Sequence, residues 1–243
     1  MQTRRFLTVA ILLSVGIMVL GGMTVVKADG FLPVVQPYNS FNDSPFKTMS
    51  FTSFRLVSMT SLPTGAFNGL VPGVTTDVPA QVLGPGSAID SVDGAGNNGN
   101  SLFYGDGSTG ITFTFDRNVL GFLPTAAGIA WTDGYVPIHF SATDGLGNPL
   151  GQVDNSACCD FSSGDGNPAN YRFFGVINSG GISSIHISNT GGGIEVDHLQ
   201  FGLLAPASAV PEPSSMTLTL FGAGFLLAAT RRRIFQPGIR RSA

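Results

Sequence analysis

The first residues in this sequence that could do chemistry are the carboxylates and amides of a glycine-rich stretch. Asp90, Asp93, Asn97 and Asn98 follow one another closely there. Calcium takes oxygen ligands from carboxylates, amides and backbone carbonyls on flexible loops of this kind. The D-x-[DN]-x-[DN]-G spacing of a helix–loop–helix calcium site is absent, so composition alone suggests the metal.

A second carboxylate, Asp197, stands in an apolar stretch. In simple β alternation it shares a strand face with Leu199 and Phe201, where an unpaired carboxylate is costly. A bound cation, a buried hydrogen bond or a bulge that turns the side chain outward would each remove this cost. We expect Asp197, with Asp90 or Asp93, to contribute to a structural calcium site, and solvated turn residues are the alternative interpretation. Calcium is the one cofactor that we expect.

The other reactive residue types do not form a catalytic pattern. Gly105 to Gly110 spells GxGxxG, but dinucleotide binding needs a helix after it, and a strand pattern follows, so we predict a turn. His139, His186 and His198 lack HxH or HExxH zinc spacing, and the first two occupy polar strand positions typical of the surface. No serine lies in a GxSxG elbow, and nothing selects a glycosidase pair among the carboxylates. We therefore predict no enzymatic activity.

The only two cysteines, Cys158 and Cys159, are adjacent. Neighbouring Cα atoms lie about 3.8 Å apart across a trans peptide, which is closer than the roughly 4.4–6.8 Å of ordinary disulfides. A strained vicinal disulfide, intermolecular disulfides and free thiols are three open alternatives for this pair. Two cysteines alone do not make a zinc site.

The charge distribution excludes nucleic acid as a partner. Residues 29–209 carry four basic residues against fourteen acidic ones, a net charge of −10. The whole chain has a net charge of only −3 because eight of its twelve basic residues lie in or beside the two terminal segments. Nucleic-acid binding needs a basic surface. The excess of Asp over Glu, with abundant Gly and Asn, indicates turns and loops instead of helices.

Alternating apolar and polar residues predict an all-β fold between the two ends. Pro137 cannot donate a ladder hydrogen bond, so its strand is a sheet edge or begins there. Asp144 to Asn148 predicts a hairpin turn. We predict an irregular segment at 29–45, one or two strands in 46–59, short strands in 61–86, and strands at 111–115, 127–131, 136–142, 150–153, 171–177, 182–188 and 194–204. This number and spacing of strands predict a single β-sandwich or jelly-roll domain at 29–209, best defined over 90–204.

The N-terminal residues predict a signal peptide at 1–28. Arg4 and Arg5 precede an uncharged run from Phe6 to Val26. Val26-Lys27-Ala28 then offers small or compact residues at the positions that a signal peptidase reads, so we expect cleavage after Ala28. Because the uncharged run is long for a secretory segment, an uncleaved anchor is the alternative.

The C-terminal region ends in a short apolar segment, Met216 to Ala229, closed by a basic cluster. A helix over 216–230 reaches only about 22 Å at about 1.5 Å per residue, whereas a hydrocarbon core is about 30 Å thick. Such a helix holds a protein in the membrane weakly, and the basic cluster keeps residues 234–243 in the cytoplasm. We therefore expect a removable anchor, with a permanent single-span anchor as the alternative.

Three parts follow one another in this tail: a proline pair around a glutamate, the apolar span and the basic cluster. Their residues are Val210, Pro211, Glu212 and Pro213, and then Arg231, Arg232 and Arg233. The pattern resembles the PEP-CTERM sorting signal of Gram-negative bacteria over residues 210–233. In that family a membrane protease, exosortase, reads the signal, and the system accompanies exopolysaccharide production. The resemblance implies processing by an exosortase-type protease, although this chain continues past its arginines to Ala243.

The middle of the chain also resembles a group of exported PEP-CTERM proteins. The likeness spans roughly Asp90 to Gly202 and is carried by Asp90–Asp93, Gly110–Phe115, Ala130–Gly134, Phe174–Ile182 and Gly193–Phe201. That group has no assigned activity, so this resemblance implies a fold and a location only.

Together these features predict an exported surface or extracellular-matrix protein with a structural or interaction role, associated with exopolysaccharide. It reaches the surface through the inner membrane and periplasm and contacts the membrane transiently through its C-terminal helix. A calcium-dependent carbohydrate-binding module is the alternative, and a polysaccharide-active enzyme is a third interpretation. Exposed aromatic residues in a row would favour the module, whereas a cleft with two close carboxylates would favour the enzyme.

Overall fold

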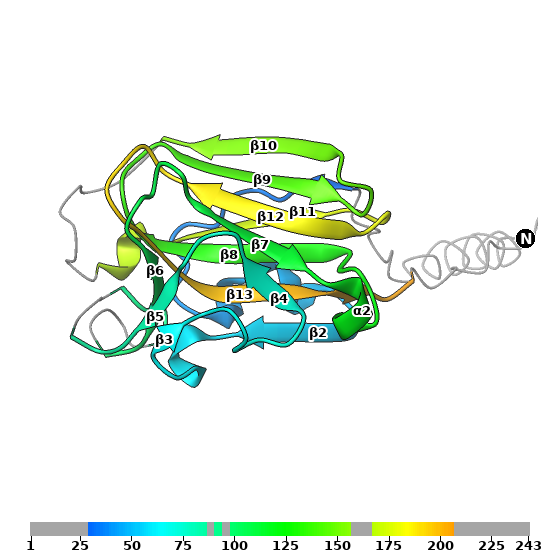
Figure 1. Ribbon diagram of the computed structural model, residues 1–243. Coiled ribbons are helices and arrows are strands. Elements are labelled where there is room, and N and C mark those ends of the chain that lie inside the picture. The colour runs from blue at the N-terminus through cyan, green and yellow to red at the C-terminus, as the bar shows by residue number, and fades with distance from the viewer. Residues whose placement is uncertain (1–28, 87–89, 94–97, 157–166, 207–243) are drawn as a thin grey trace, which may run out of the picture. The chain divides into compact units, whose positions relative to one another are not determined.

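The computed structural model describes residues 29–86, 90–93, 98–156 and 167–206, and over these residues the protein is built almost entirely of antiparallel strands (Figure 1). The strands form two sheets, which confirms the predicted all-β sandwich. The larger sheet contains β1 (Gly30–Phe31), β2 (Phe51–Val57), β3 (Gly65–Ala66), β5 (Gln81–Leu83), β6 (Ser101–Tyr104), β8 (Ala126–Asp133), β11 (Arg172–Ile177) and β13 (Ile194–Leu204). The smaller sheet contains β4 (Val74–Thr76), β7 (Ile111–Phe115), β9 (Ile138–Asp144), β10 (Pro149–Asn155) and β12 (Ile182–Ser188). The helical turns are η1 (Phe41–Asp43), η2 (Pro45–Thr48), η3 (Met59–Ser61), α2 (Arg117–Leu120) and η4 (Pro168–Asn170).

The strands from β6 to β13 have jelly-roll topology. Their order is β11-β8-β13-β6 in the larger sheet and β10-β9-β12-β7 in the smaller one. Consecutive strands therefore belong to alternate sheets. The exception is β9 and β10, which are neighbours in the smaller sheet and are joined by the predicted hairpin turn. In that turn the Asp144 carbonyl accepts from the Gly147 N–H at 3.1 Å. The connections form the double Greek key of a jelly roll.

Apolar side chains from both sheets fill the space between them. Ile111, Phe113 and Phe115 of β7 are all buried on the inner face. The ring of Phe115 lies 5.1 Å from that of Phe201 on β13, and Phe140 of β9 lies 5.7 Å from Phe174 of β11. Each such side chain contributes about 1.5–3 kcal/mol when it is fully buried, so this layer supplies the main driving force of the fold.

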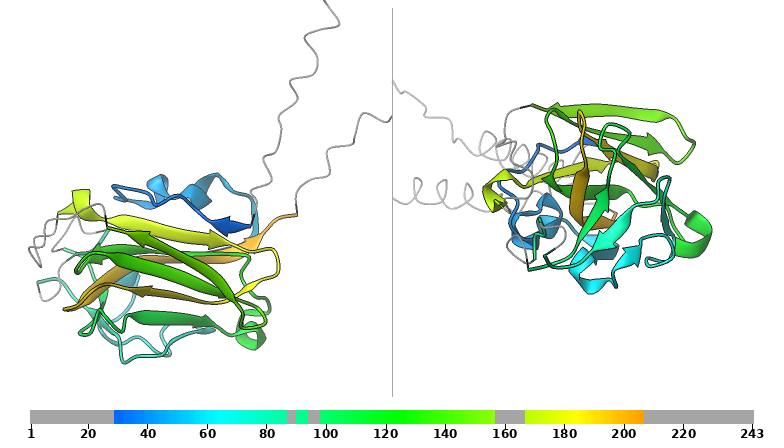
Figure 2. Two further views of the ribbon diagram at one scale, coloured as in Figure 1. Left: turned by 90° about the horizontal axis from the view of Figure 1, so that it is seen from above. Right: turned by 60° about the vertical axis from the view of Figure 1, so that its left-hand side comes forward.

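A second apolar cluster covers the outer face of the larger sheet. The N-terminal residues provide Tyr38 and Phe46, whose rings contact Phe173 of β11 at 5.2 and 5.5 Å. Figure 2 shows this segment, in blue, along one side of the sandwich. The prediction that residues 29–45 are irregular was incomplete, because they contain β1 and η1. These residues cover the outer face of the larger sheet, so that β8, β11 and β13 are buried on both faces.

Two local predictions about turns and strand ends are resolved by the structure. Pro137 marks a strand start, because β9 begins at Ile138 and lies between β10 and β12 inside the smaller sheet. Gly105 to Gly110 is a turn followed directly by β7, as predicted. The Asp106 carboxylate accepts from the side chains of Ser108 and Thr109 at 2.6 and 2.8 Å, and these hydrogen bonds lower the pKa of Asp106.

Within residues 29–86, 90–93, 98–156 and 167–206, no helix has the length and apolarity needed to cross a bilayer. The apolar segments predicted at 6–26 and 216–229 lie outside these ranges.

Candidate functional site

A β-bulge in the middle of β13 determines which residues face outward. Asp197 pairs with Ala130 of β8 and Gln200 pairs with Gly128, so three steps on β13 match two on β8. The extra residue, His198, has a φ of +48°, a left-handed conformation that histidine adopts more readily than most residues. The expected alternation is therefore wrong for Asp197, which lies on the outer face and not with Leu199 and Phe201.

The Asp197 carboxylate accepts four hydrogen bonds although it is fully buried. Oδ1 accepts from the backbone N–H groups of Met59 and His198 at 2.9 and 2.7 Å. Oδ2 accepts from the Val92 N–H at 3.0 Å and the Ser91 hydroxyl at 3.1 Å. Burial raises the pKa of Asp197, while His198 and the backbone donors oppose this shift. Asp197 thus ties η3 and the segment 90–93 to the central strand of the larger sheet.

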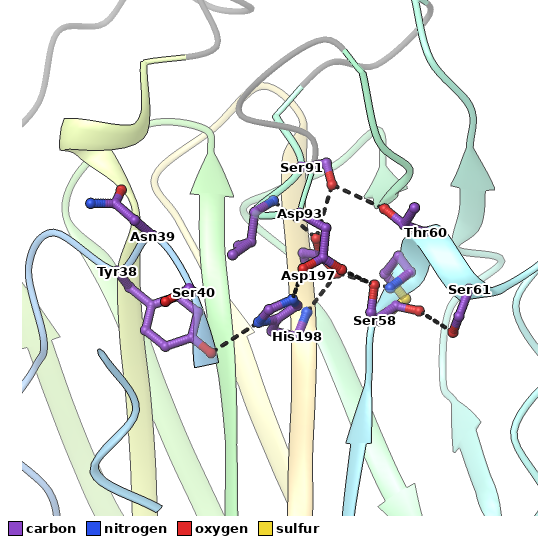
Figure 3. Close-up of polar contacts among 12 residues, drawn as sticks. Tyr38, Asn39, Ser40, Ser58, Thr60, Ser61, Ser91, Asp93, Asp197 and His198 are labelled. Atoms are coloured by element: carbon purple, nitrogen blue, oxygen red, sulfur yellow. Dashed lines mark hydrogen bonds and ion pairs between the residues drawn. The ribbon is translucent and has the colours of Figure 1, made fainter. Parts of the chain in front are cut away.

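The His198 imidazole bridges a buried phenol and a carboxylate that reaches the surface (Figure 3). Its Nδ1 lies 2.9 Å from the Tyr38 hydroxyl, and its Nε2 lies 2.8 Å from Oδ1 of Asp93. The Ser58 hydroxyl donates to the other oxygen of Asp93. Tyr38 is completely buried, whereas the Asp93 side chain is 39% exposed. The chain of contacts therefore runs from the second apolar cluster to solvent.

The hydrogen-bond network continues inward from Tyr38 to Gln200 and Ser44. The Phe46 N–H donates to the Ser44 hydroxyl, which donates to Oε1 of Gln200 at 2.6 Å. The Gln200 amide then donates to the Tyr38 oxygen at 2.7 Å, which leaves the Tyr38 proton for Nδ1 of His198. On the other side of the ring, the Nε2 atom of His198 faces Oδ1 of Asp93. We call Tyr38, Asp93, Asp197, His198 and Gln200 the β13 polar cluster.

The β13 polar cluster does not have the arrangement of a catalytic triad. In a catalytic triad the imidazole lies between a reachable hydroxyl and a carboxylate. Here the hydroxyl next to His198 belongs to Tyr38, which is inaccessible and whose pKa is raised mainly by burial. Ser58 contacts Asp93 and not the imidazole. No hydroxyl of the cluster is therefore both activated and exposed.

Two of the three predicted calcium ligands are brought together. Asp93, Asp197 and His198 each offer a ligand atom, and these atoms lie within 4.8 Å of one another. Asp90 lies apart from them: its backbone N–H donates to Oε2 of the buried Glu195 at 3.1 Å. Burial raises the pKa of Glu195, and the hydrogen bond from Asp90 opposes the shift. Of the three expected ways to lower the cost of burying Asp197, the structure shows the hydrogen bonds and the bulge.

Tyr38, His198 and Gln200 are the residues of the cluster that the sequence did not indicate as site residues. The one signal for His198 was the Asp197-His198 pair, two adjacent polar residues where alternation allows one. The other two histidines lie half-buried on the outer face of the smaller sheet, where their polar strand positions placed them. Cys158, Cys159 and the tail residues Val210–Pro213 and Arg231–Arg233 lie outside the described residues.

Among known protein families, a sequence model matches this chain in the C-terminal tail. Residues 209–233 match the sequence model of the PEP-CTERM protein-sorting motif. The chain carries a PEP-CTERM sorting motif. The match confirms the resemblance seen in the tail, and this motif implies processing by exosortase and supports export to the cell surface.

Comparison with solved structures finds only distant likeness. The catalytic domain of a GH87 alpha-1,3-glucanase in complex with nigerose is 15% identical with a TM-score of 0.36, over 68% of this chain and 31% of that one. The C-terminal family 22 carbohydrate-binding module of Clostridium thermocellum Xyn10B is 11% identical with a TM-score of 0.32, over 61% of this chain and 98% of that one. Likenesses of this size assign no activity and no ligand. No curated protein matches the chain.

Proposed function

We propose that the protein is an exported component of the cell surface or extracellular matrix with a structural or interaction role. The observation that carries this proposal is the PEP-CTERM sorting motif at residues 209–233. The chain passes the inner membrane and periplasm behind its signal peptide. Its C-terminal helix holds it in the membrane until an exosortase-type protease removes the tail.

The geometry of the β13 polar cluster supports a non-enzymatic role. Its buried carboxylate is saturated by four donors, and its imidazole is held at both nitrogens. These groups join η2, η3 and the segment 90–93 to β13, which stabilises the sandwich.

Exopolysaccharide is the partner that we propose, and the outer face of the smaller sheet is the surface suited to it. Side chains there are mainly hydroxyls that can exchange hydrogen bonds with sugar hydroxyls. They include Thr112, Thr114, Ser141, Thr143 and Ser184. The four strands β7, β9, β10 and β12 contain no lysine or arginine, so recognition there rests on hydrogen bonds instead of attraction to an anionic polymer.

Affinity electrophoresis in gels containing exopolysaccharide from the producing bacterium tests this partner. We expect the protein to be retarded, and we expect the variant Thr112→Val/Thr114→Val/Ser184→Ala to lose retardation, because each lost hydrogen bond of about 1 kcal/mol weakens binding roughly fivefold. A matched variant on other surfaces, Thr48→Val/Thr52→Val/Ser61→Ala, should migrate like the parent protein. Equal mobility of all three proteins with and without polysaccharide would refute the partner.

A calcium-dependent carbohydrate-binding module is the second candidate, favoured by the closeness of Asp93, Asp197 and His198. Calcium would bind the exposed carboxylate of Asp93, next to the buried carboxylate of Asp197. At 100 times its dissociation constant, calcium that binds only the folded state adds about 2.7 kcal/mol of stability. We expect thermal melting in millimolar calcium to exceed melting in EDTA, and superimposable curves rule this candidate out.

A further inference from the structure

Two histidines lie on the same outer face of the smaller sheet, on neighbouring strands. On β9, His139 pairs with Ser188 of β12, and on β12, His186 pairs with Ser141 of β9. Phe140 and Ile187, which follow them on the two strands, point into the core, so both imidazoles project outward. The two histidines are therefore diagonal neighbours, whose Cα atoms lie roughly 7–8 Å apart with the Cβ atoms somewhat closer. Two imidazoles can meet across this separation.

Each imidazole is oriented by a partner on its Nδ1 atom. Nδ1 of His139 lies 2.8 Å from Oδ1 of Asp154 on β10, and the Gln152 amide donates to the same oxygen at 2.6 Å. Nδ1 of His186 lies 3.1 Å from the Thr112 hydroxyl on β7. The Nε2 atom is thus the free coordinating position of each ring. A carboxylate that accepts from the other ring nitrogen, as Asp154 can from His139, is a usual support of a histidine that binds a metal.

The surroundings favour a cation. No lysine or arginine lies on β7, β9, β10 or β12, while Asp154 stands behind His139 and Asp77 lies near His186.

We propose that His139 and His186 form a surface site for a divalent transition metal, with water completing its coordination. Two imidazole nitrogens select Cu²⁺, Zn²⁺ or Ni²⁺ over calcium and magnesium, which prefer oxygen. Cu²⁺ binds most tightly among the divalent ions of its row at a given nitrogen site. The site is separate from the β13 polar cluster, which lies on the outer face of the other sheet.

Copper binding followed by electron paramagnetic resonance tests the site. The parent protein for this test carries Cys158→Ser and Cys159→Ser, because thiolates would compete for copper. We expect one Cu²⁺ per chain, with hyperfine structure from two imidazole nitrogens. His139→Gln and His186→Gln should each reduce the spectrum to a single imidazole and weaken binding at least tenfold. Asp154→Asn, which alters only the support of His139, should weaken binding about tenfold.

Thr75→Val is the matched control, since Thr75 pairs with Thr114 on the same face of the sheet and lies on β4, outside the four strands proposed for polysaccharide binding, and the copper affinity of this variant should equal that of the parent. Circular dichroism of each variant checks that the sheets are intact. The proposal is overturned if the double variant His139→Gln/His186→Gln binds copper like the parent. It is also overturned if the parent spectrum shows one imidazole or none. Neither result bears on export or on exopolysaccharide binding.

Discussion

Replacing Asp197 with alanine is expected to lower the free energy of unfolding by about 3–5 kcal/mol, a large part of the roughly 5–15 kcal/mol that stabilises a typical domain. The substitution leaves the backbone N–H groups of Met59 and Val92 without acceptors in a site that water does not reach. Each buried donor left unpaired costs about 1–3 kcal/mol. Segments η3 and 90–93 lose their attachment to β13 together, so urea unfolding should show one large shift of the midpoint.

Asp154→Ala is the matched control for this prediction. Its carboxylate also accepts hydrogen bonds, from His139 and Gln152, but the side chain is 57% exposed. Exposed pairs of this kind contribute about 0–1 kcal/mol, so the control should unfold close to the wild type. If Asp197→Ala and Asp154→Ala shift the midpoint equally, the β13 polar cluster does not stabilise the fold as described.

Replacing Arg231, Arg232 and Arg233 with serine is expected to prevent normal processing of the tail. An arginine at the centre of a membrane helix costs roughly 2.5–3.5 kcal/mol, so three of them hold the end of the apolar span on the cytoplasmic side. Without them the short span has no fixed depth, and the protease meets its site at the wrong position. Immunoblots of cell fractions should show full-length, mislocalised protein in place of the shortened surface form.

Arg240→Ser/Arg241→Ser is the control for the basic cluster. This variant also replaces adjacent arginines with serine, but outside the matched residues 209–233, so processing should be unchanged. Normal shortening of the Arg231–Arg233 variant would show that the cluster has no role in sorting.

The sequence predicted the ends of three strands correctly, at residues 111–115, 182–188 and 194–204. Alternation marks β7 and β12, which have one face in the core. A glycine directly before each of the three strands marks its start. β6 was missed, since Ser101–Tyr104 follows a glycine-rich stretch and is too short to show a period. The packing of residues 29–46 on the outer face of the larger sheet was not predicted. Its contacts with β11 join positions more than a hundred residues apart, and local sequence patterns do not reveal such contacts.

The β13 polar cluster shows the same limit at the level of single residues. That Asp197 needed compensation could be predicted from its apolar neighbours, and hydrogen bonding and a bulge were among the stated alternatives. Which donors meet it could not be predicted, because Met59 and Val92 come from distant segments. The bulge at His198 shifts every later residue of β13 to the opposite face, so strict alternation places Asp197 on the same face as Leu199 and Phe201 by mistake.

We expect the chain to be exported and then shortened at its C-terminal sorting motif. Intact mass spectrometry of the protein recovered from the cell surface or the medium measures both events at once. The predicted mature species begins after Ala28 and lacks the residues beyond the Pro211–Pro213 region. A mature chain that still carries Arg231 to Ala243 would show that the sorting motif is not processed.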